Sequence, residues 1–252
     1  MRKPWMVVLM GMGFALLVAC STDNETPLED SASENPESTD CGEEGEPYYI
    51  EANGLVSLEF EDSTPPEGWA LQNDTNGVSG QGYLVWTGSP SMGSPGEGQM
   101  AFRLRISTPG EYRFLWKSAY LKGDNGTEHN DSWLRFPDAQ DFYGSKGNGE
   151  SRVYPKGSGK SPHPNGSSAE GWFKVYRSGN DPIFKWQANT SDHDAHQIYV
   201  LFETPGIYTL EVSPRSDYHG IDQLLLFTET RYTENEAIAT ADTLSEKGSC
   251  LD

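Results

Sequence analysis

The sequence predicts an all-β protein, a two-sheet antiparallel β-sandwich of the jelly-roll kind, and three features carry that prediction. From Pro47 onward, apolar and polar residues alternate in short segments, as in strands with one buried face. No window of this region repeats apolar residues at helical spacing over three turns. The 27 Gly and 16 Pro residues of the chain punctuate the segments and mark turns. Many short strands without helices are typical of two packed sheets.

The first nineteen residues have the composition of a secretory signal peptide. Arg2 and Lys3 give a positive start, and residues 6–18 form an apolar run. That run is shorter than the about 20 apolar residues of a membrane-spanning helix. It ends in Leu-Val-Ala-Cys, which fits the site where lipoprotein signal peptidase cuts before a lipid-modified cysteine. We therefore expect residues 1–19 to be removed and Cys20 to carry the lipid.

Residues 20–46 are expected to form an acidic tether between the lipid and the domain. Positions 21–46 contain ten Asp and Glu and no Lys or Arg. Such a segment buries too little apolar surface to offset the entropy of ordering it. Under the enterobacterial sorting rule, Ser21 favours the outer membrane over the inner one. The sequence does not distinguish the periplasmic face of that membrane from its outer face. A single domain is then expected over residues 47–252.

Ten segments of this domain are predicted to be strands. They are residues 55–61, 82–86, 100–106, 112–117, 132–136, 171–176, 183–187, 198–203, 208–213 and 223–228.

Two connections between these strands resemble each other. Residues 102–112 and 198–208 each read strand, Thr-Pro-Gly turn, and a strand that opens on Tyr, which predicts two hairpins. The polar stretch 138–168 is longer than an ordinary connection and is expected to be a functional or mobile loop.

The charge and the cysteines limit the partners and suggest one covalent link. A net charge of −20 repels nucleic acid and anionic lipid, so we expect no nucleic-acid partner and membrane contact through the lipid anchor only. With Cys20 assigned to lipid, Cys41 and Cys250 remain at the two ends of the domain in an oxidising compartment. They predict a disulfide that joins the ends, and two free thiols are the alternative.

Several motifs, taken in order, resemble one family. The opening Leu-Val-x-Leu-Glu-x-Glu, a Gly-Tyr-Leu segment, the two Thr-Pro-Gly-x-Tyr turns and a closing Gly-Ile-Asp-x-Leu-x-Leu resemble carbohydrate-binding modules of families 6 and 35. The resemblance covers most of residues 50–230, and the stretch 138–168 is longer than expected in those modules. It implies a galactose-binding-like β-sandwich that binds a polysaccharide or oligosaccharide without cleaving it.

The resemblance also implies a structural calcium ion. In those modules the glutamates of the opening strand and the aspartate of the last strand hold it, and the matching positions here are Glu59, Glu61 and Asp222. Two carboxylates two residues apart share one strand face and repel unless a hard cation takes their oxygens. The alternative is a solvated pair on an edge strand.

The sugar site is expected at loops near one end of the sandwich. Sugar rings stack on flat aromatic faces, and their hydroxyls meet planar polar groups. The candidates are the polar loop residues Glu128, His129, Asn130 and Asp131, the loop-flanking platforms Trp133 and Trp172, and the residues before the last strand, Asp217, Tyr218 and His219. The loop before Trp133 is equally consistent with a second calcium site or an ordinary polar turn. For Trp133 and Trp172, the alternative is that each ring packs inside the protein.

No catalytic set is recognised, so we expect a binding protein rather than an enzyme. The Glu-x-Asp-x-x-Glu pattern of jelly-roll retaining glycosidases is absent, and no nucleophile motif lies on a strand-to-helix turn. A polysaccharide lyase or a glycosidase on the same architecture remains an alternative, because Arg103, Arg105, Arg113 and Lys117 recur on neighbouring strands. A structural subunit of a cell-envelope complex, with protein partners there, is the other alternative.

Overall fold

The computed structural model describes residues 47–147 and 151–249, and it confirms the all-β sandwich. One sheet has the order β17–β1–β5–β15–β7–β11, antiparallel throughout except for the parallel pair β1–β5. Its strands are β17 (Lys247–Ser249), β1 (Pro47–Ile50), β5 (Met100–Ile106), β15 (Gly206–Pro214), β7 (Asp131–Arg135) and β11 (Trp172–Tyr176), with β10 (Ser168–Ala169) added at the edge.

The second sheet has the order β2–β16–β6–β14–β8–β9 and is antiparallel. Its strands are β2 (Leu55–Glu59), β16 (His219–Phe227), β6 (Gly110–Tyr120), β14 (His196–Phe202), β8 (Asp141–Ser145) and β9 (Arg152–Val153). The β3–β4 hairpin (Trp69–Gln72 and Tyr83–Trp86) joins the start of β16, β12 (Lys185–Trp186) joins β6, and β13 (Asn189–Thr190) links β11 to β14.

The core lies between the two sheets. Strand β5 alternates buried and more exposed residues along its whole length, as a strand with one core face does. Its Phe102 and Leu104 belong to the same buried cluster as Phe114 and Trp116 of β6. Aromatic residues fill much of this cluster, and Phe114 packs edge-on against Trp116 with 5.6 Å between ring centroids. All ten predicted strands are present, with ends that differ by a few residues.

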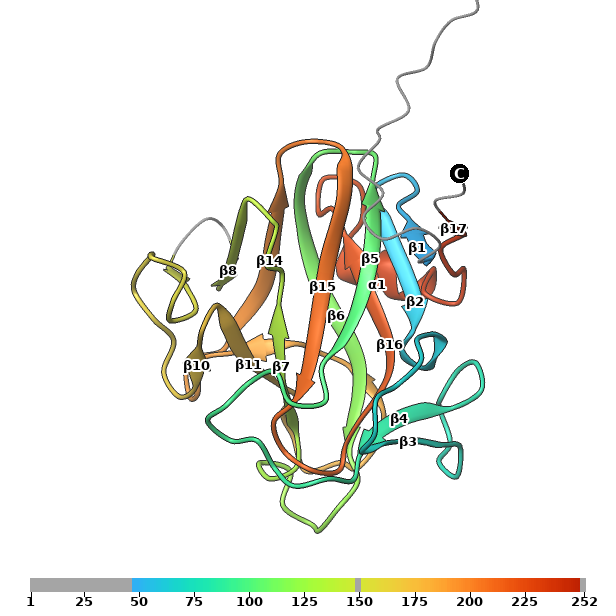
Figure 1. Ribbon diagram of the computed structural model, residues 1–252, viewed down its shortest axis with the longest axis vertical. Helices are drawn as coiled ribbons and strands as arrows, with labels where there is room; N and C mark the ends of the chain where they lie inside the picture. Colours follow the sequence, from blue (N-terminus) through green and yellow to red (C-terminus); the bar gives the residue numbers. More distant parts are fainter. Residues whose placement is uncertain (1–46, 148–150, 250–252) are drawn as a thin grey trace, which may run out of the picture. The chain divides into compact units, whose positions relative to one another are not determined.

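The two Thr-Pro-Gly turns do not close hairpins, so the prediction of two hairpins at residues 102–112 and 198–208 is wrong. Each turn carries the chain from one sheet to the other, since β5 pairs with β15 and β6 pairs with β14. The two arches lie side by side at the top of Figure 1. Their repeated Tyr forms the same hydrogen bond in both, because Tyr112 Oη donates to the Thr108 carbonyl at 2.7 Å and Tyr208 Oη to the Thr204 carbonyl at 2.8 Å. The repeat therefore encodes a matched pair of crossings between the sheets.

The polar stretch 138–168 is not one long loop, so the prediction of a single functional or mobile loop there is wrong. It contains β8 and β9, and β8 pairs with β14 over residues 141–145. Gly144 interrupts the alternating pattern by which β8 could have been predicted, yet a glycine is needed at this position. A Cβ at Gly144 would lie 2.8 Å from Cγ2 of Thr190 and 2.9 Å from Cγ2 of Val153. Close approach of the neighbouring segments thus selects a residue that weakens the strand pattern.

One short helix was missed. Helix α1 (Glu234–Ala239) begins with a capping box, in which the Thr233 hydroxyl accepts from the Glu236 amide and the Glu236 carboxylate accepts from the Thr233 amide. Ala237 is its buried residue, and the helix packs near β16. In the described part of the chain, no helix has the length and apolarity needed to cross a membrane.

Candidate functional site

Two loops meet at one end of the sandwich, and the strand register forces them together. Residues 121–130 join β6 to β7, and residues 215–218 join β15 to β16. Tyr120 pairs with His219 in one sheet, and Ser132 pairs with Pro214 in the other. Both loops therefore cross between the sheets at the same place, and the Leu121 amide donates to the Tyr218 carbonyl at 2.9 Å.

Four side chains of these loops form what we call the terminal-loop cluster: Lys122, His129, Asp217 and Tyr218. The Asp217 carboxylate lies 2.7 Å from Lys122 Nζ and 2.6 Å from His129 Nδ1. Lys122 Nζ also lies 4.9 Å from the centroid of the Tyr218 ring, and the His129 ring meets Tyr218 edge-on at 6.5 Å. The cluster combines a carboxylate, an ammonium, an imidazole and a half-buried aromatic ring.

The electrostatics of the cluster favour an ionised carboxylate. Partial burial opposes the charge on Asp217, but hydrogen bonds and charge from Lys122 and His129 outweigh it and lower the pKa of this carboxyl below its usual value. The hydrogen bond to Asp217 in turn raises the pKa of Lys122. Asp217 is therefore a charged acceptor, and it is held in one place from two sides.

The backbone of the cluster is strained at two of its members. His129 has φ 54° and Tyr218 has φ 57°, in the left-handed region that side chains other than Gly rarely adopt. Such strain costs on the order of 1–3 kcal/mol at each residue, and it concentrates at functional sites. Tyr218 packs against a small apolar cluster that includes Tyr83 and Phe184, which holds its ring in place.

The other polar candidates of these loops have structural roles or lie at the rim. Asn130 is buried and donates through Nδ2 to the Arg177 carbonyl at 2.6 Å. Asp131 is buried and pairs with Arg215 Nη1 at 2.6 Å. Both residues anchor the loop to the sandwich. Glu128 is exposed and accepts from Asn125 Nδ2 at 3.2 Å within its own turn, so it lies beside the cluster.

His219 is buried rather than displayed in the loop. Its Nδ1 lies 2.9 Å from the Ser132 hydroxyl, and its ring packs edge-on against Trp116. Complete burial, with a smaller contribution from the charge of Arg177, lowers the pKa of His219 to about 3. The imidazole is therefore neutral at physiological pH, and it is part of the buried interior at this end of the sandwich.

Both tryptophans proposed as sugar platforms are buried. Trp133 is 0 % exposed, and its indole Nε1 donates to the Ser91 carbonyl at 2.9 Å. Trp172 is 2 % exposed and lies beneath the Arg135 guanidinium, 4.4 Å from the ring centroid. Neither ring has a free face for a sugar, so the expectation that they are exposed is wrong. Each alternates along its strand with a core residue, Leu134 or Phe173, so its ring lies on the other face of the sheet. There the segment around Ser91 covers Trp133, and the Arg135 guanidinium covers Trp172.

The three carboxylates assigned to calcium converge on the segment 79–82, and we call them the carboxylate cluster. Ser79 Oγ donates to Glu59 at 3.0 Å and lies 3.2 Å from Asp222, and the Gln81 amide donates to Glu61 at 2.8 Å. Contrary to the expectation from sequence, Glu61 does not continue the strand. Strand β2 ends at Glu59, and the buried Phe60 opens the 3₁₀ turn η1 (Phe60–Asp62), which swings Glu61 towards the same segment.

A bulge directs the third carboxylate into this cluster. The register of β16 against β6 shifts between Ile221 and Gln223, at Asp222. Asp222 is 0 % exposed, and its Oδ2 lies 2.8 Å from Lys117 Nζ. Lys117 offsets part of the negative charge of the cluster.

The chemistry of the carboxylate cluster fits a hard cation, but its side chains are not arranged as a complete set of metal ligands. Burial first, and then the neighbouring charges of Glu61 and Asp222, raise the pKa of Glu59 to about 7. Glu61 Oε2 is buried without a hydrogen-bond partner. Calcium prefers carboxylate oxygens of this kind. As they stand, no three His, Cys, Asp or Glu side chains within residues 47–147 and 151–249 are gathered closely enough to hold a metal ion.

Three predicted residues lie outside the described part of the chain: the lipidated Cys20 and the pair Cys41 and Cys250. One member of the terminal-loop cluster, Lys122, was not foreseen from the sequence. It stands before the Gly-Asp-Asn-Gly turn at residues 123–126. Only the pairing of β6 with β16 reveals that its amine reaches Asp217.

No family model and no curated protein matches the chain. Among the solved structures that match it, three illustrate the low similarity. A GH26-CBM35 β-(1,4)-mannanase from Podospora anserina is 16% identical, and the match covers 70% of this chain and 28% of that one at a TM-score of 0.41. Xyl-CBM35, in complex with a disaccharide containing glucuronic acid, is 12% identical and is matched over 78% of this chain and 99% of that one at 0.38. A ruminal GH26 endo-β-1,4-mannanase is 14% identical and is matched over 73% of this chain and 28% of that one at 0.36.

Proposed function

We propose that this protein is a cell-envelope lipoprotein whose β-sandwich binds polysaccharide without cleaving it, through the terminal-loop cluster. The observation that carries the proposal is the pair of strained residues, His129 and Tyr218, which flank an ionised Asp217 at one end of the fold. Neither strained residue belongs to the main core: Tyr218 packs on the small apolar cluster, and His129 lies against Asp217. Strained backbone of this kind is more frequent at functional sites, which supports the proposal.

The cluster supplies the two kinds of contact that sugar rings require. Asp217 offers carboxylate oxygens, and hydrogen bonds to a charged acceptor are stronger than those between neutral groups. Lys122 offers ammonium protons at the same point, and its side chain is about half exposed at 48%. The Tyr218 ring lies against Lys122 and offers apolar area with few rotatable bonds. Adjacent hydroxyls of one sugar pair with the carboxylate and the ammonium together.

Calcium is part of the proposal as a structural ion. Glu59, Glu61 and Asp222 would hold it and join β2, β16 and the segment 79–82. The raised pKa of Glu59 and the unpartnered buried oxygen of Glu61 support this assignment. Charge neutralisation is the chemistry that the ion would supply, and the ion would carry no step of binding.

The lipid anchor and its location complete the proposal. The Cys20 motif supports acylation, and the acidic segment after it supports a tether. The tether would hold the domain at the outer membrane, on its periplasmic or its outer face. Weak binding by single domains suffices on a cell surface, because many anchored copies engage one polymer. Other envelope proteins are further partners compatible with this display.

A lyase is the second candidate, because one contact favours it. His129 Nδ1 lies 2.6 Å from Asp217, and Tyr218 stands beside the imidazole. Histidine and tyrosine are the residues that move protons in lyases of jelly-roll architecture. Such an enzyme also needs a cationic cleft to neutralise a uronate, whereas Lys122 is already paired with Asp217. The arrangement therefore favours binding.

The site is tested by retention of the full chain, kept in mild detergent, in gels that contain plant or bacterial polysaccharides. Tyr218→Ala and Asp217→Asn are each expected to weaken retention about tenfold, which corresponds to about 1.4 kcal/mol. The matched control is Tyr232→Ala, since Tyr232 is also a partly buried Tyr packed on an apolar cluster but lies elsewhere in the fold. Equal retention of the two site variants and the wild type, with unchanged melting temperatures, would contradict the site.

A further inference from the structure

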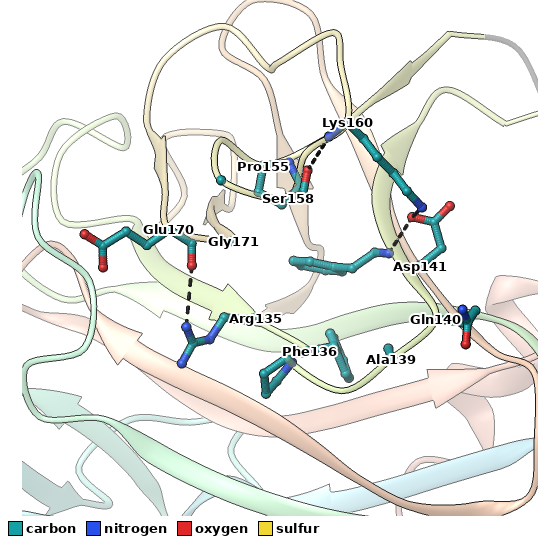
Figure 2. A pocket seen from close by; sticks show the side chains of 13 residues that line it. Arg135, Phe136, Ala139, Gln140, Asp141, Pro155, Ser158, Lys160, Glu170 and Gly171 are labelled. Carbon is teal, nitrogen blue, oxygen red and sulfur yellow. Dashed lines mark hydrogen bonds and ion pairs between the residues drawn. The ribbon is translucent and has the colours of Figure 1, made fainter.

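A pocket of about 300 Å³ lies away from the terminal loops, between the β7–β8 connection and the turn 155–160 (Figure 2). We call it the β7–β8 pocket. Phe136, Phe142 and Pro155 contribute apolar surface, and Arg135, Ser158 and Lys160 contribute polar groups. Its outer wall comes from the turn 155–160.

The outer wall is held in place by hydrogen bonds of its own. The Tyr154 amide donates to the Pro162 carbonyl at 2.8 Å, and the Gly171 amide donates to the Lys156 carbonyl at 2.8 Å. Gly157 has φ 92°, and a Cβ there would lie 3.0 Å from Cα of Glu170. The turn thus packs backbone to backbone against residues 170–171. A pocket with such a wall is preformed, which reduces the entropy lost on binding.

The base of the pocket is apolar and its rim is polar. Phe136 and Phe142 are 4 % and 8 % exposed, with ring centroids 5.3 Å apart, so each shows only a small part of its surface. Figure 2 places Ser158 and Lys160 on the turn side, opposite Arg135 and Phe136. Gln140 adds an exposed amide at the rim. A ligand that fits has an apolar face and polar edges, as a sugar ring has.

The charges of the lining exclude a strongly ionic ligand. Arg135 Nε and Nη2 both lie 2.6 Å from Glu211 Oε2, and Lys160 Nζ lies 2.9 Å from Asp141 Oδ1. Each lining cation therefore has a carboxylate partner. Glu170, a further acid of the lining, and the net charge of −20 disfavour an anion as well. An anionic sugar would have to displace a carboxylate from one of these pairs.

We infer that the β7–β8 pocket is a second saccharide site, which binds one or two residues of a neutral glycan. The volume lies at the lower end of the range of small-molecule pockets, which limits the ligand to this size. The inference rests on the proposed function for the class of ligand but uses a separate surface. Two sites on one anchored domain let it hold a polymer at two points, and this raises the overall affinity without a new contact at either.

The test is calorimetric titration of the full chain with four probes: cellotriose, mannotriose, xylotriose and the anionic trigalacturonic acid. Ser158→Phe places a ring in the pocket from an exposed turn, and Gln140→Ala removes a rim amide without adding bulk. Thr230→Phe, at an exposed position in the turn after β16, is the matched control. At least one neutral trisaccharide is expected to lose tenfold or more in affinity with Ser158→Phe and about threefold with Gln140→Ala, and to bind Thr230→Phe as it binds wild type.

The outcomes separate this inference from the proposed function. Loss of trisaccharide binding in Ser158→Phe but not in Asp217→Asn supports the pocket, even if the terminal-loop cluster fails its own test. Loss in Asp217→Asn alone supports the cluster and overturns the pocket. Binding of trigalacturonic acid that Ser158→Phe abolishes overturns the neutral preference, and no binding of any probe overturns the second site.

Discussion

Replacement of Glu59 by Gln should stabilise the protein at high pH when calcium is removed. Burial and the carboxylates of Glu61 and Asp222 raise the pKa of Glu59 from 4.5 in the unfolded chain to about 7 in the fold. A carboxyl with a raised folded pKa contributes full stability below pH 4.5, and it loses that contribution as the pH rises through 7. The Gln side chain keeps the size and can still accept from Gln223 Nε2, which donates to Glu59 Oε1 at 3.0 Å.

The magnitude follows from the rise in the pKa. A change from 4.5 to about 7 corresponds to at most about 3 kcal/mol at pH 8, and to nothing below pH 4.5. For a domain of this size, each kcal/mol moves the melting temperature by about 2–4 °C. In EDTA at pH 8, Glu59→Gln should therefore melt roughly 5–10 °C above wild type. At pH 4.5 the two should melt nearly together.

Calcium should reverse the order of the two proteins. If Glu59 is a ligand, excess calcium at pH 8 raises the melting temperature of wild type much more than that of Glu59→Gln. The assay is thermal unfolding followed by near-ultraviolet circular dichroism at both pH values, with EDTA or calcium. The control is Glu128→Gln, which makes the same change at an exposed position. A variant no more stable than wild type at pH 8 in EDTA would refute the electrostatic reasoning, and equal calcium effects would refute the metal site.

Three further predictions concern the core and the ends of the chain. Trp133→Ala and Trp172→Ala should each lower the free energy of unfolding by about 3–5 kcal/mol, measured by urea denaturation, because both rings are buried; a loss below about 1 kcal/mol would contradict their burial. Cys41 and Cys250 should appear as one linked peptide pair in non-reducing mass mapping, since Pro47 pairs with Ser249, and alkylation of both without reductant would rule the bond out. Cys20→Ser should move the protein from the detergent phase to the aqueous phase, and an unchanged partition would argue against the lipid.

The strands could be predicted from the sequence because their alternation reflects one buried face. Strand β5 shows this pattern, and its predicted bounds are the observed ones. The strands that were missed are short or interrupted, as β8 is by Gly144, whose lack of a side chain makes room for Thr190 and Val153. The Thr-Pro-Gly repeats could be recognised as turns. Whether such a turn closes a hairpin or crosses between sheets depends on the strand pairing, which local sequence does not contain.

The candidate site was predictable in its loops but not in its exposed surfaces. Both halves of the terminal-loop cluster, around His129 and around Asp217, were chosen from polar composition, and the register of β6 with β16 brings them together. Lys122 was missed because its partner is distant in sequence. Trp133 was interpreted as a platform because it follows a loop. It lies inside β7 on the face opposite the core residue Leu134, and only the folded structure shows that the segment around Ser91 and the Arg215 guanidinium cover its ring.

The most direct test of the account measures binding and cleavage in the same sample. The full chain in mild detergent is incubated with a polysaccharide that retards it in an affinity gel, and the mixture is assayed for new reducing ends and for unsaturated uronate absorbance. The account predicts retardation that Tyr218→Ala weakens, with no product above the level of a protein-free control over a day. Accumulation of either product, lost in His129→Ala, would show that the terminal-loop cluster is an active site and would contradict the binding function.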